Sequence, residues 1–105
     1  MKIIEKGFDD KGLKTLFEDN NVSGGISFGT VTILPGERVP KEGLSKHKED
    51  EYSVIIEGEI EGESGGEPYS VSQSNATLIP AEEEHWAINS SDKPCKIVWA
   101  LVSKE

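Results

Sequence analysis

The alternation of short apolar runs with turn residues constrains the fold of this chain most strongly. Runs rich in β-branched and aromatic residues recur between residues 26 and 102, and each is short for a helix. Turn residues separate them, as at Pro35-Gly36 and Gly65-Gly66. About seven or eight short strands at near-regular spacing predict a β-sandwich or barrel. The expected strands are 26–28, 31–33, 52–56, 60–64, 68–71, 77–79, 85–88 and 95–102.

Two segments differ from this simple pattern. Leu13, Leu16 and Phe17 have the i, i+3, i+4 spacing of a helix, so we expect a helical turn within residues 11–19, although a glycine there weakens the prediction. Residues 95–102 are apolar on both faces, which is typical of a strand at the centre of a sheet or at an oligomer interface. We therefore expect a homodimer.

The length and the cysteine content predict a simple organisation. A chain of 105 residues corresponds to one domain, so we expect a single domain over 1–105 with a barrel core at about residues 25–103. Cys95 is the one cysteine, which excludes an internal disulfide. Residues 1–6 carry no signal-peptide pattern, and no stretch approaches the ~18 apolar residues of a membrane span. These features predict a cytoplasmic protein.

The charge balance narrows the range of partners. The chain carries 20 acidic and 11 basic residues, which gives a formal net charge of −9. A surplus of carboxylates repels the phosphates of nucleic acids and the headgroups of anionic membranes. We therefore expect neither a nucleic acid nor a membrane as a partner.

The residues best suited to chemistry lie around the two histidines of the chain. His47 and Glu51 are four residues apart, so both side chains point to the same side of an extended segment. His85 begins a later apolar run and can approach them from across a barrel. Two imidazoles and one carboxylate form a ligand set for a divalent transition metal and leave up to about three coordination positions open. We expect Fe, Mn, Ni or Zn at this site.

Residues 35–102 resemble the cupin superfamily, in particular its small single-domain members. The first cupin motif, G-x5-H-x-H-x3/4-E-x6-G, is matched here by Gly36, His47, Glu51 and Gly58. The resemblance implies an all-β fold, the double-stranded β-helix or jelly-roll barrel, in which two sheets face one pocket.

The second cupin motif, G-x5-P-x-G-x2-H-x3-N, supports the same resemblance. It is matched by Pro80, His85 and Asn89 at the family spacing. Its second glycine is replaced by Glu82, which affects a turn rather than the metal ligands.

The first histidine of the family's ligand pair is missing from this chain. Ser45 stands two residues before His47, and the family spacing counted forward from Gly36 leads to Glu42. The resemblance therefore implies that Glu42 serves as a fourth metal ligand and as a catalytic general base. A solvated loop carboxylate is the alternative for Glu42, and Ser45 or water would then fill the gap.

The resemblance also implies a range of functions. The first is a metal-dependent enzyme acting on a small polar substrate by dioxygenase, isomerase or lyase-type chemistry. The alternatives are a non-catalytic sensor of a small molecule or sugar, and a metal-free degenerate cupin. Arg38 would clamp a substrate carboxylate, unless it is a surface turn residue. Tyr52, Trp86 and Trp99 would line the substrate pocket, unless they pack in the core.

Overall fold

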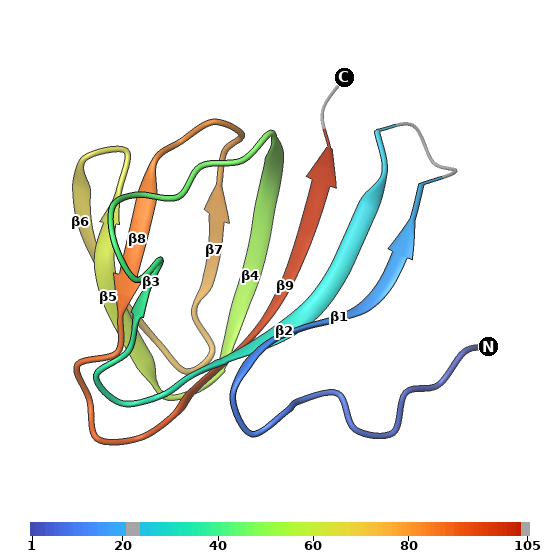
Figure 1. Ribbon diagram of the computed structural model, residues 1–105, viewed down its shortest axis with the longest axis horizontal. Helices are drawn as coiled ribbons and strands as arrows, with labels where there is room; N and C mark the ends of the chain where they lie inside the picture. The colour runs from blue at the N-terminus through green and yellow to red at the C-terminus, as the bar shows by residue number, and fades with distance from the viewer. Residues whose placement is uncertain (21–23, 104–105) are drawn as a thin grey trace.

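The structure, a computed structural model, describes residues 1–20 and 24–103. Within those ranges its regular secondary structure consists of strands, which are joined by loops (Figure 1). No helix among the described residues is long and apolar enough to cross a membrane. The strands are β1 (Gly12–Asp19), β2 (Ile26–Ile33), β3 (Arg38–Val39), β4 (Glu49–Glu57), β5 (Glu59–Ser64), β6 (Glu67–Ser72), β7 (Ala76–Ile79), β8 (His85–Ile88) and β9 (Cys95–Ser103).

Two antiparallel sheets face each other. The larger sheet has the order β1-β2-β9-β4-β7, and the smaller one has the order β3-β8-β5-β6. The chain crosses repeatedly between them, so that β4 and β5 are consecutive in sequence but lie in different sheets. This arrangement is an all-β jelly roll and confirms the predicted fold class. β9 is the third of five strands in its sheet, which agrees with the central placement predicted for residues 95–102.

The helical turn predicted within residues 11–19 is wrong, because this segment is strand β1. β1 pairs with β2, and a bulge shifts the register between Thr15 and Phe17. Leu13 therefore pairs with Val31, whereas Phe17 pairs with Phe28 and stacks on its ring at a centroid distance of 6.4 Å. The bulge turns Leu13 and Phe17 to opposite faces of the sheet, and pairing with β2 outweighs the weak helical pattern.

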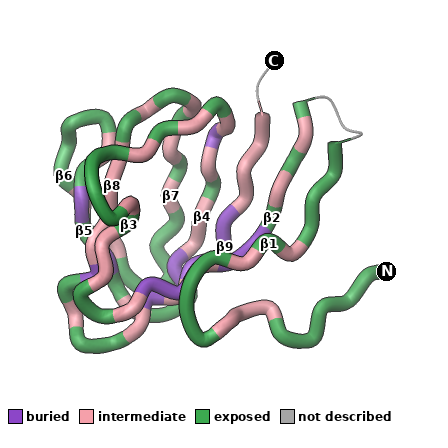
Figure 2. Tube along the Cα trace, in the orientation of Figure 1, coloured by how far each residue is buried: buried purple, intermediate pink, exposed green. Residues whose placement is uncertain are grey.

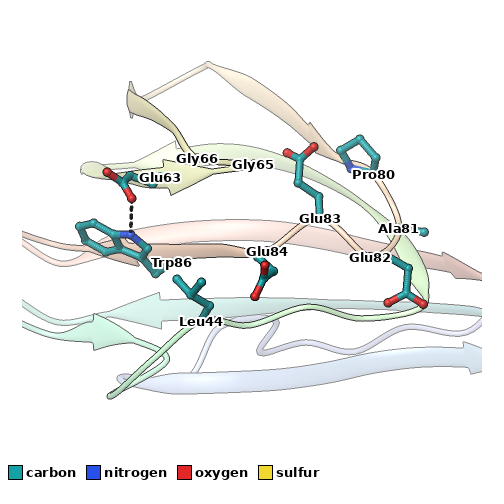
Figure 3. Close-up of a pocket in the computed structure, with 10 residues that line it drawn as sticks. All are labelled: Leu44, Glu63, Gly65, Gly66, Pro80, Ala81, Glu82, Glu83, Glu84 and Trp86. Carbon is teal, nitrogen blue, oxygen red and sulfur yellow. Dashed lines mark hydrogen bonds between the residues drawn. The ribbon is translucent and has the colours of Figure 1, made fainter.

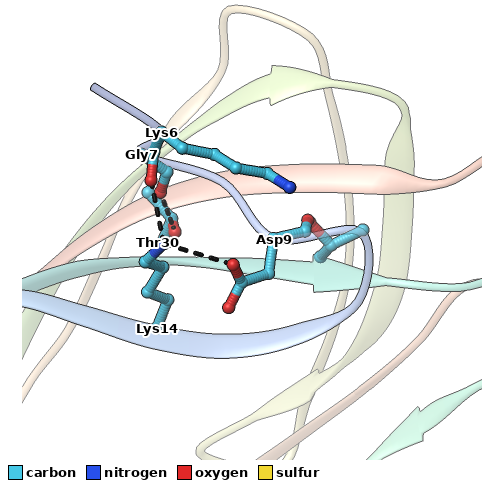
Figure 4. A network of polar contacts seen from close by, with 6 residues as sticks. Lys6, Gly7, Asp9, Lys14 and Thr30 are labelled. Atoms are coloured by element: carbon cyan, nitrogen blue, oxygen red, sulfur yellow. Dashed lines mark hydrogen bonds and ion pairs between the residues drawn. The ribbon is translucent and has the colours of Figure 1, made fainter. Parts of the chain in front are cut away.

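The N-terminal segment crosses the outer face of the larger sheet (Figure 4). The hydroxyl of Thr30 donates to the carbonyl oxygen of Gly7 at 2.6 Å, and Lys14 Nζ lies 3.2 Å from a carboxylate oxygen of Asp9. Lys14 Nζ also donates to the carbonyl oxygen of Lys6 at 2.9 Å. These contacts cover one end of the outer face and leave the inner face to the core.

The hydrophobic core lies at one end of the space between the sheets. It consists of Ile33, Ile55, Ile60, Cys95 and Ile97, each at most 8% exposed. Figure 2 shows most of the buried segments crowded where β2, β9 and β4 come together. The opposite end, near the beginnings of β4 and β8, holds the predicted metal ligands.

Candidate metal centre

The structure brings His47, Glu51 and His85 together between the two sheets. Glu51 lies on β4 of the larger sheet, His85 begins β8 of the smaller one, and His47 comes from the loop before β4. One ligand atom from each residue lies within 4.8 Å of the other two, and all three residues are half-buried. Atoms bound to one ion at about 2.0–2.2 Å are at most about 4.4 Å apart, so small side-chain adjustments suffice for a shared metal.

Backbone hydrogen bonds hold the two histidine-bearing loops against each other. Ser45 and His85 form an isolated β-bridge, in which each N–H donates to the other's carbonyl oxygen at 2.9 Å. The N–H of Glu82 donates to the carbonyl oxygen of His47 at 2.7 Å. The amide of Ala81 donates to the buried Asp50 carboxylate at 2.8 Å. The three side chains are thus placed by a fixed backbone rather than by free loops.

Hydrogen bonds also fix the orientation of both imidazoles. Nδ1 of His47 lies 3.0 Å from the carbonyl oxygen of Glu49, and Nδ1 of His85 lies 2.9 Å from that of Glu83. A carbonyl oxygen only accepts, so each Nδ1 is the donor and each neutral ring keeps its lone pair on Nε2. Metal-binding histidines in proteins are held in this way.

One contact in the cluster joins two hydrogen-bond acceptors when His47 is neutral and Glu51 is a carboxylate. Nε2 of His47 lies 3.2 Å from Oε1 of Glu51. An imidazole lone pair and a carboxylate oxygen are both acceptors, so the pair needs a positive charge between or on them. That charge is either a proton, which makes His47 an imidazolium, or a metal ion.

A cavity of about 590 Å³ adjoins the cluster and extends between the sheets. His47, Glu51 and His85 line it, but most of its wall is apolar, as with Ile79 and Leu101. Trp99 also lines this cavity and is only 7% exposed, and its role in a substrate pocket stays a prediction. The cavity has the size typical of a small-molecule site.

The other predicted site residues lie elsewhere. Glu42 is exposed and lies outside the group of three ligand residues, so its roles as ligand and base stay predictions. Tyr52 is 47% exposed and points away from the cavity, because it is the strand neighbour of Glu51. The Arg38 guanidinium donates to the carbonyl oxygen of Pro40 at 2.7 Å and stacks on Trp86 at 4.7 Å.

Trp86 lines a second, shallower hollow on the surface (Figure 3). Its indole N–H donates to the carboxylate of Glu63 at 3.3 Å. The hollow has a volume of about 550 Å³, and three further glutamates line it: Glu82, Glu83 and Glu84. Glu83 also lines the main cavity, so it lies between the two spaces.

Sequence reasoning missed several polar residues of the main cavity. Ser53 and Thr77 face it from β4 and β7, and Ser64 and Tyr69 face it from β5 and β6. Only Ser53 carried a signal, since it is two residues from Glu51 on one strand and must share its face. The others require the pairing of distant strands.

Comparisons with known proteins agree with this architecture. The profile of the Cupin_2 family, described as a cupin domain, matches residues 29–101. None of the curated proteins that were compared is significantly similar in sequence. Among solved structures, the Cnp3 cupin domain of Schizosaccharomyces pombe has a TM-score of 0.77 at 12% identity over 88% of this chain, and this chain covers 64% of that one.

Two bacterial structures are similar over more of their length. The plu4264 protein from Photorhabdus luminescens has a TM-score of 0.76 at 20% identity, with 99% of this chain and 90% of that one covered. The Cupin_2 domain of an XRE family transcriptional regulator from Enterobacter cloacae has a TM-score of 0.73 at 20% identity, with 89% and 96% covered. At such identities the likeness concerns the fold.

Proposed function

The chain belongs to the Cupin_2 family of cupin domains, and on this basis we propose that it binds one divalent transition metal through His47, Glu51 and His85. The adjoining cavity then holds a small molecule next to the metal. We propose further that the protein is a metal-dependent enzyme.

The observation that carries this proposal is the contact between His47 and Glu51. Both Nδ1 atoms in the cluster donate to carbonyl oxygens, so Nε2 of His47 and Oε1 of Glu51 face each other as two acceptors at 3.2 Å. A divalent cation satisfies both atoms and Nε2 of His85 at once, whereas a proton on His47 satisfies only the pair. The donor set of two imidazoles and one carboxylate fits Fe, Mn, Ni or Zn.

The residues of the cluster leave part of the metal's coordination shell free. Three protein ligands leave up to about three positions of an octahedral ion for substrate, oxygen or water. A metal bound in this way supplies Lewis-acid or redox chemistry. The chain itself holds the three ligands in position through its backbone hydrogen bonds and excludes bulk water with the apolar cavity wall.

A non-catalytic sensor is the second candidate, and one observation favours it. Glu42, which the resemblance offered as the general base, is exposed and lies outside the cluster. The carboxylate of Glu83 lines the cavity, but it accepts a hydrogen bond from Ser64 at 2.6 Å. An enzyme that moves protons needs a group within reach of the substrate, and a sensor does not.

Metal analysis of the purified protein tests the proposed site. We expect close to one transition-metal ion per chain, and its loss in His47→Ala and in His85→Ala, because no neighbouring side chain replaces a neutral nitrogen ligand. Lys46→Ala, an exposed change beside His47, is the matched control and should keep the metal. Full metal occupancy in either histidine variant would refute the assignment. Turnover screening with the loaded protein then separates an enzyme from a sensor.

We also propose that the protein is a homodimer. A row of cross-strand neighbours on the outer face of the larger sheet joins Phe17, Phe28, Ala100, Tyr52 and Leu78. The four large side chains of this row are between 36% and 54% exposed, and the row is uncharged. Burying it against a second copy is favourable. Sedimentation at micromolar concentration should show a dimer, and a monomer would refute the proposal.

A further inference from the structure

With distance from His47, Glu51 and His85, the cavity wall on the larger sheet changes from a charged row to neutral hydroxyls and then to apolar side chains. The inner face of the larger sheet shows this in three successive rows, each about 6.8 Å beyond the last for an antiparallel sheet. The first row places Glu51 beside Leu101 and Ile79. The second row places Ser53 beside Trp99 and Thr77. The third row joins Ile55, Ile97 and Val31 at the edge of the core.

Most polar groups beyond the metal cluster are uncharged or already paired. The hydroxyl of Tyr69 donates to the carbonyl oxygen of Trp86 at 3.2 Å. Burial, and to a lesser extent the charges of Glu51 and Cys95, raises the pKa of Tyr69 to about 12, so this hydroxyl stays neutral. The indole N–H of Trp99 is neutral and buried, and it has no hydrogen-bond partner among the described residues.

The cavity also lacks a positive side chain. Among the described residues that line it, none is a lysine or an arginine. The guanidinium of Arg38 is engaged outside it, with Pro40 and Trp86. The carboxylates of Glu67 and Glu83 lie on the wall instead. A second anionic group at the far end of a ligand would therefore be desolvated without a partner.

From this distribution we propose that the cavity binds small molecules with one oxygen-bearing polar head and an apolar body. The head lies at the metal centre, and the body extends along Trp99 towards Ile55 and Ile97. Dicarboxylates and phosphorylated sugars are excluded, since their second charged group would lie in the apolar part. This inference rests on the proposed metal site, and it replaces the expected small polar substrate with one that is polar at one end only.

Two fatty acids, one diacid and one amino acid test this inference by isothermal titration of the metal-loaded protein. Octanoate and octanedioate have the same length and the same first carboxylate, and they differ only at the far end. We expect octanoate to bind at least tenfold more tightly. We also expect octanoate to bind about tenfold more tightly than hexanoate, because two more methylenes are buried. Equal or tighter binding of octanedioate or 8-aminooctanoate would overturn the inference.

A pair of variants tests where the apolar body lies. Val71 lines the cavity from β6, so Val71→Phe should fill part of it and weaken octanoate binding at least fivefold. Ile56→Phe is the matched control, because Ile56 is 45% exposed and does not line the cavity. Its octanoate affinity should equal that of the parent protein. Equal octanoate affinity in Val71→Phe and the parent, at equal metal content, would overturn the placement.

Failure of the metal site is distinguishable from failure of this inference. If the purified protein takes up no metal, the proposed function fails, and the same ligands are titrated against the metal-free protein by tryptophan fluorescence. A preference for octanoate over octanedioate then still supports an apolar cavity with one polar end. If neither ligand binds in either form of the protein, the inference is overturned.

Discussion

The two ends of the cavity share strand β4 but are held together by different forces. At one end, Nε2 of His47 and Oε1 of Glu51 on β4 face each other at 3.2 Å, and His85 approaches them from β8. At the other end, β4 and β9 contribute Ile55, Cys95 and Ile97, which are buried and apolar. A single strand, β4, thus passes from the cluster of His47, Glu51 and His85 to the core within a few residues. The difference indicates that stability and metal binding can be changed separately.

The strongest test of this separation is a cavity-creating change in the core. Ile55 is 1% exposed, so Ile55→Ala should lower the free energy of unfolding by about 2–5 kcal/mol. Urea unfolding of the metal-free protein measures this. Ile56→Ala, at the neighbouring exposed position, should cost much less. The metal affinity of folded Ile55→Ala should equal that of the parent, and a large loss of affinity would show that the two ends are coupled.

The thiol at the core end gives a second test, which depends on pH. Burial, with a smaller contribution from the Glu59 carboxylate, raises the pKa of Cys95 from 9.0 to about 11. Below pH 9 the folded protein should therefore hold about 100-fold less thiolate than the unfolded chain and react that much more slowly with a thiol reagent. The folded pKa is the higher one, so this contribution to stability is complete below pH 9 and is lost as the pH rises through 11. Fast labelling at pH 8 without denaturant would contradict the buried placement.

A change at the polar end should lower metal affinity without lowering the stability of the metal-free protein. Glu51→Gln keeps the size of the side chain and removes its charge, so metal affinity should fall at least tenfold. The same change supplies an amide N–H that can donate to Nε2 of His47, so the metal-free protein should unfold at the same or a higher urea concentration. Metal titration and urea unfolding check the two results. A marked loss of stability in the metal-free form would show that Glu51 is structural.

Residue patterns predicted the strands and the ligand cluster well, because both depend on local spacing. The four-residue separation of His47 and Glu51 places them on one side of the chain, and the resemblance to the cupin motifs brings in His85 from the other sheet. Strand alternation places Tyr52, the neighbour of Glu51, on the outer face and so argues against its predicted place in the substrate pocket. Asn89, the last residue of the second motif, is buried and donates to the carbonyl oxygens of Ile33 and Lys93.

What could not be predicted depends on register and on loop paths. The bulge in β1 places Leu13 and Phe17 on opposite faces of the sheet, and no residue pattern predicts this bulge. The meeting of Trp99, Ser53 and Thr77 on one row requires the pairing of three strands that are far apart in sequence. The cytoplasmic location also stays a prediction, because nothing in the fold bears on it.

The smallest expected effect is the change in metal affinity caused by a substitution at Glu42. The family spacing makes this residue a candidate for a fourth ligand, whereas the structure leaves its side chain exposed between Lys41 and Gly43. Glu42→Gln keeps the size and removes the charge. A carboxylate that is exposed to water contributes little to a metal centre that it does not reach, so metal affinity should change less than about twofold.

A metal titration with two ions makes the Glu42 test decisive. A carboxylate ligand favours Mn or Fe(II) over softer ions, so a role for Glu42 would appear as a loss of Mn affinity that exceeds the loss of Zn affinity. Glu84→Gln, at another exposed glutamate near the cluster, is the matched control for a general charge effect. A loss of tenfold or more in Mn affinity, in Glu42→Gln alone, would mean that the loop closes over the metal and restores the fourth ligand. Equal small effects in both variants would leave His47, Glu51 and His85 as the complete protein ligand set.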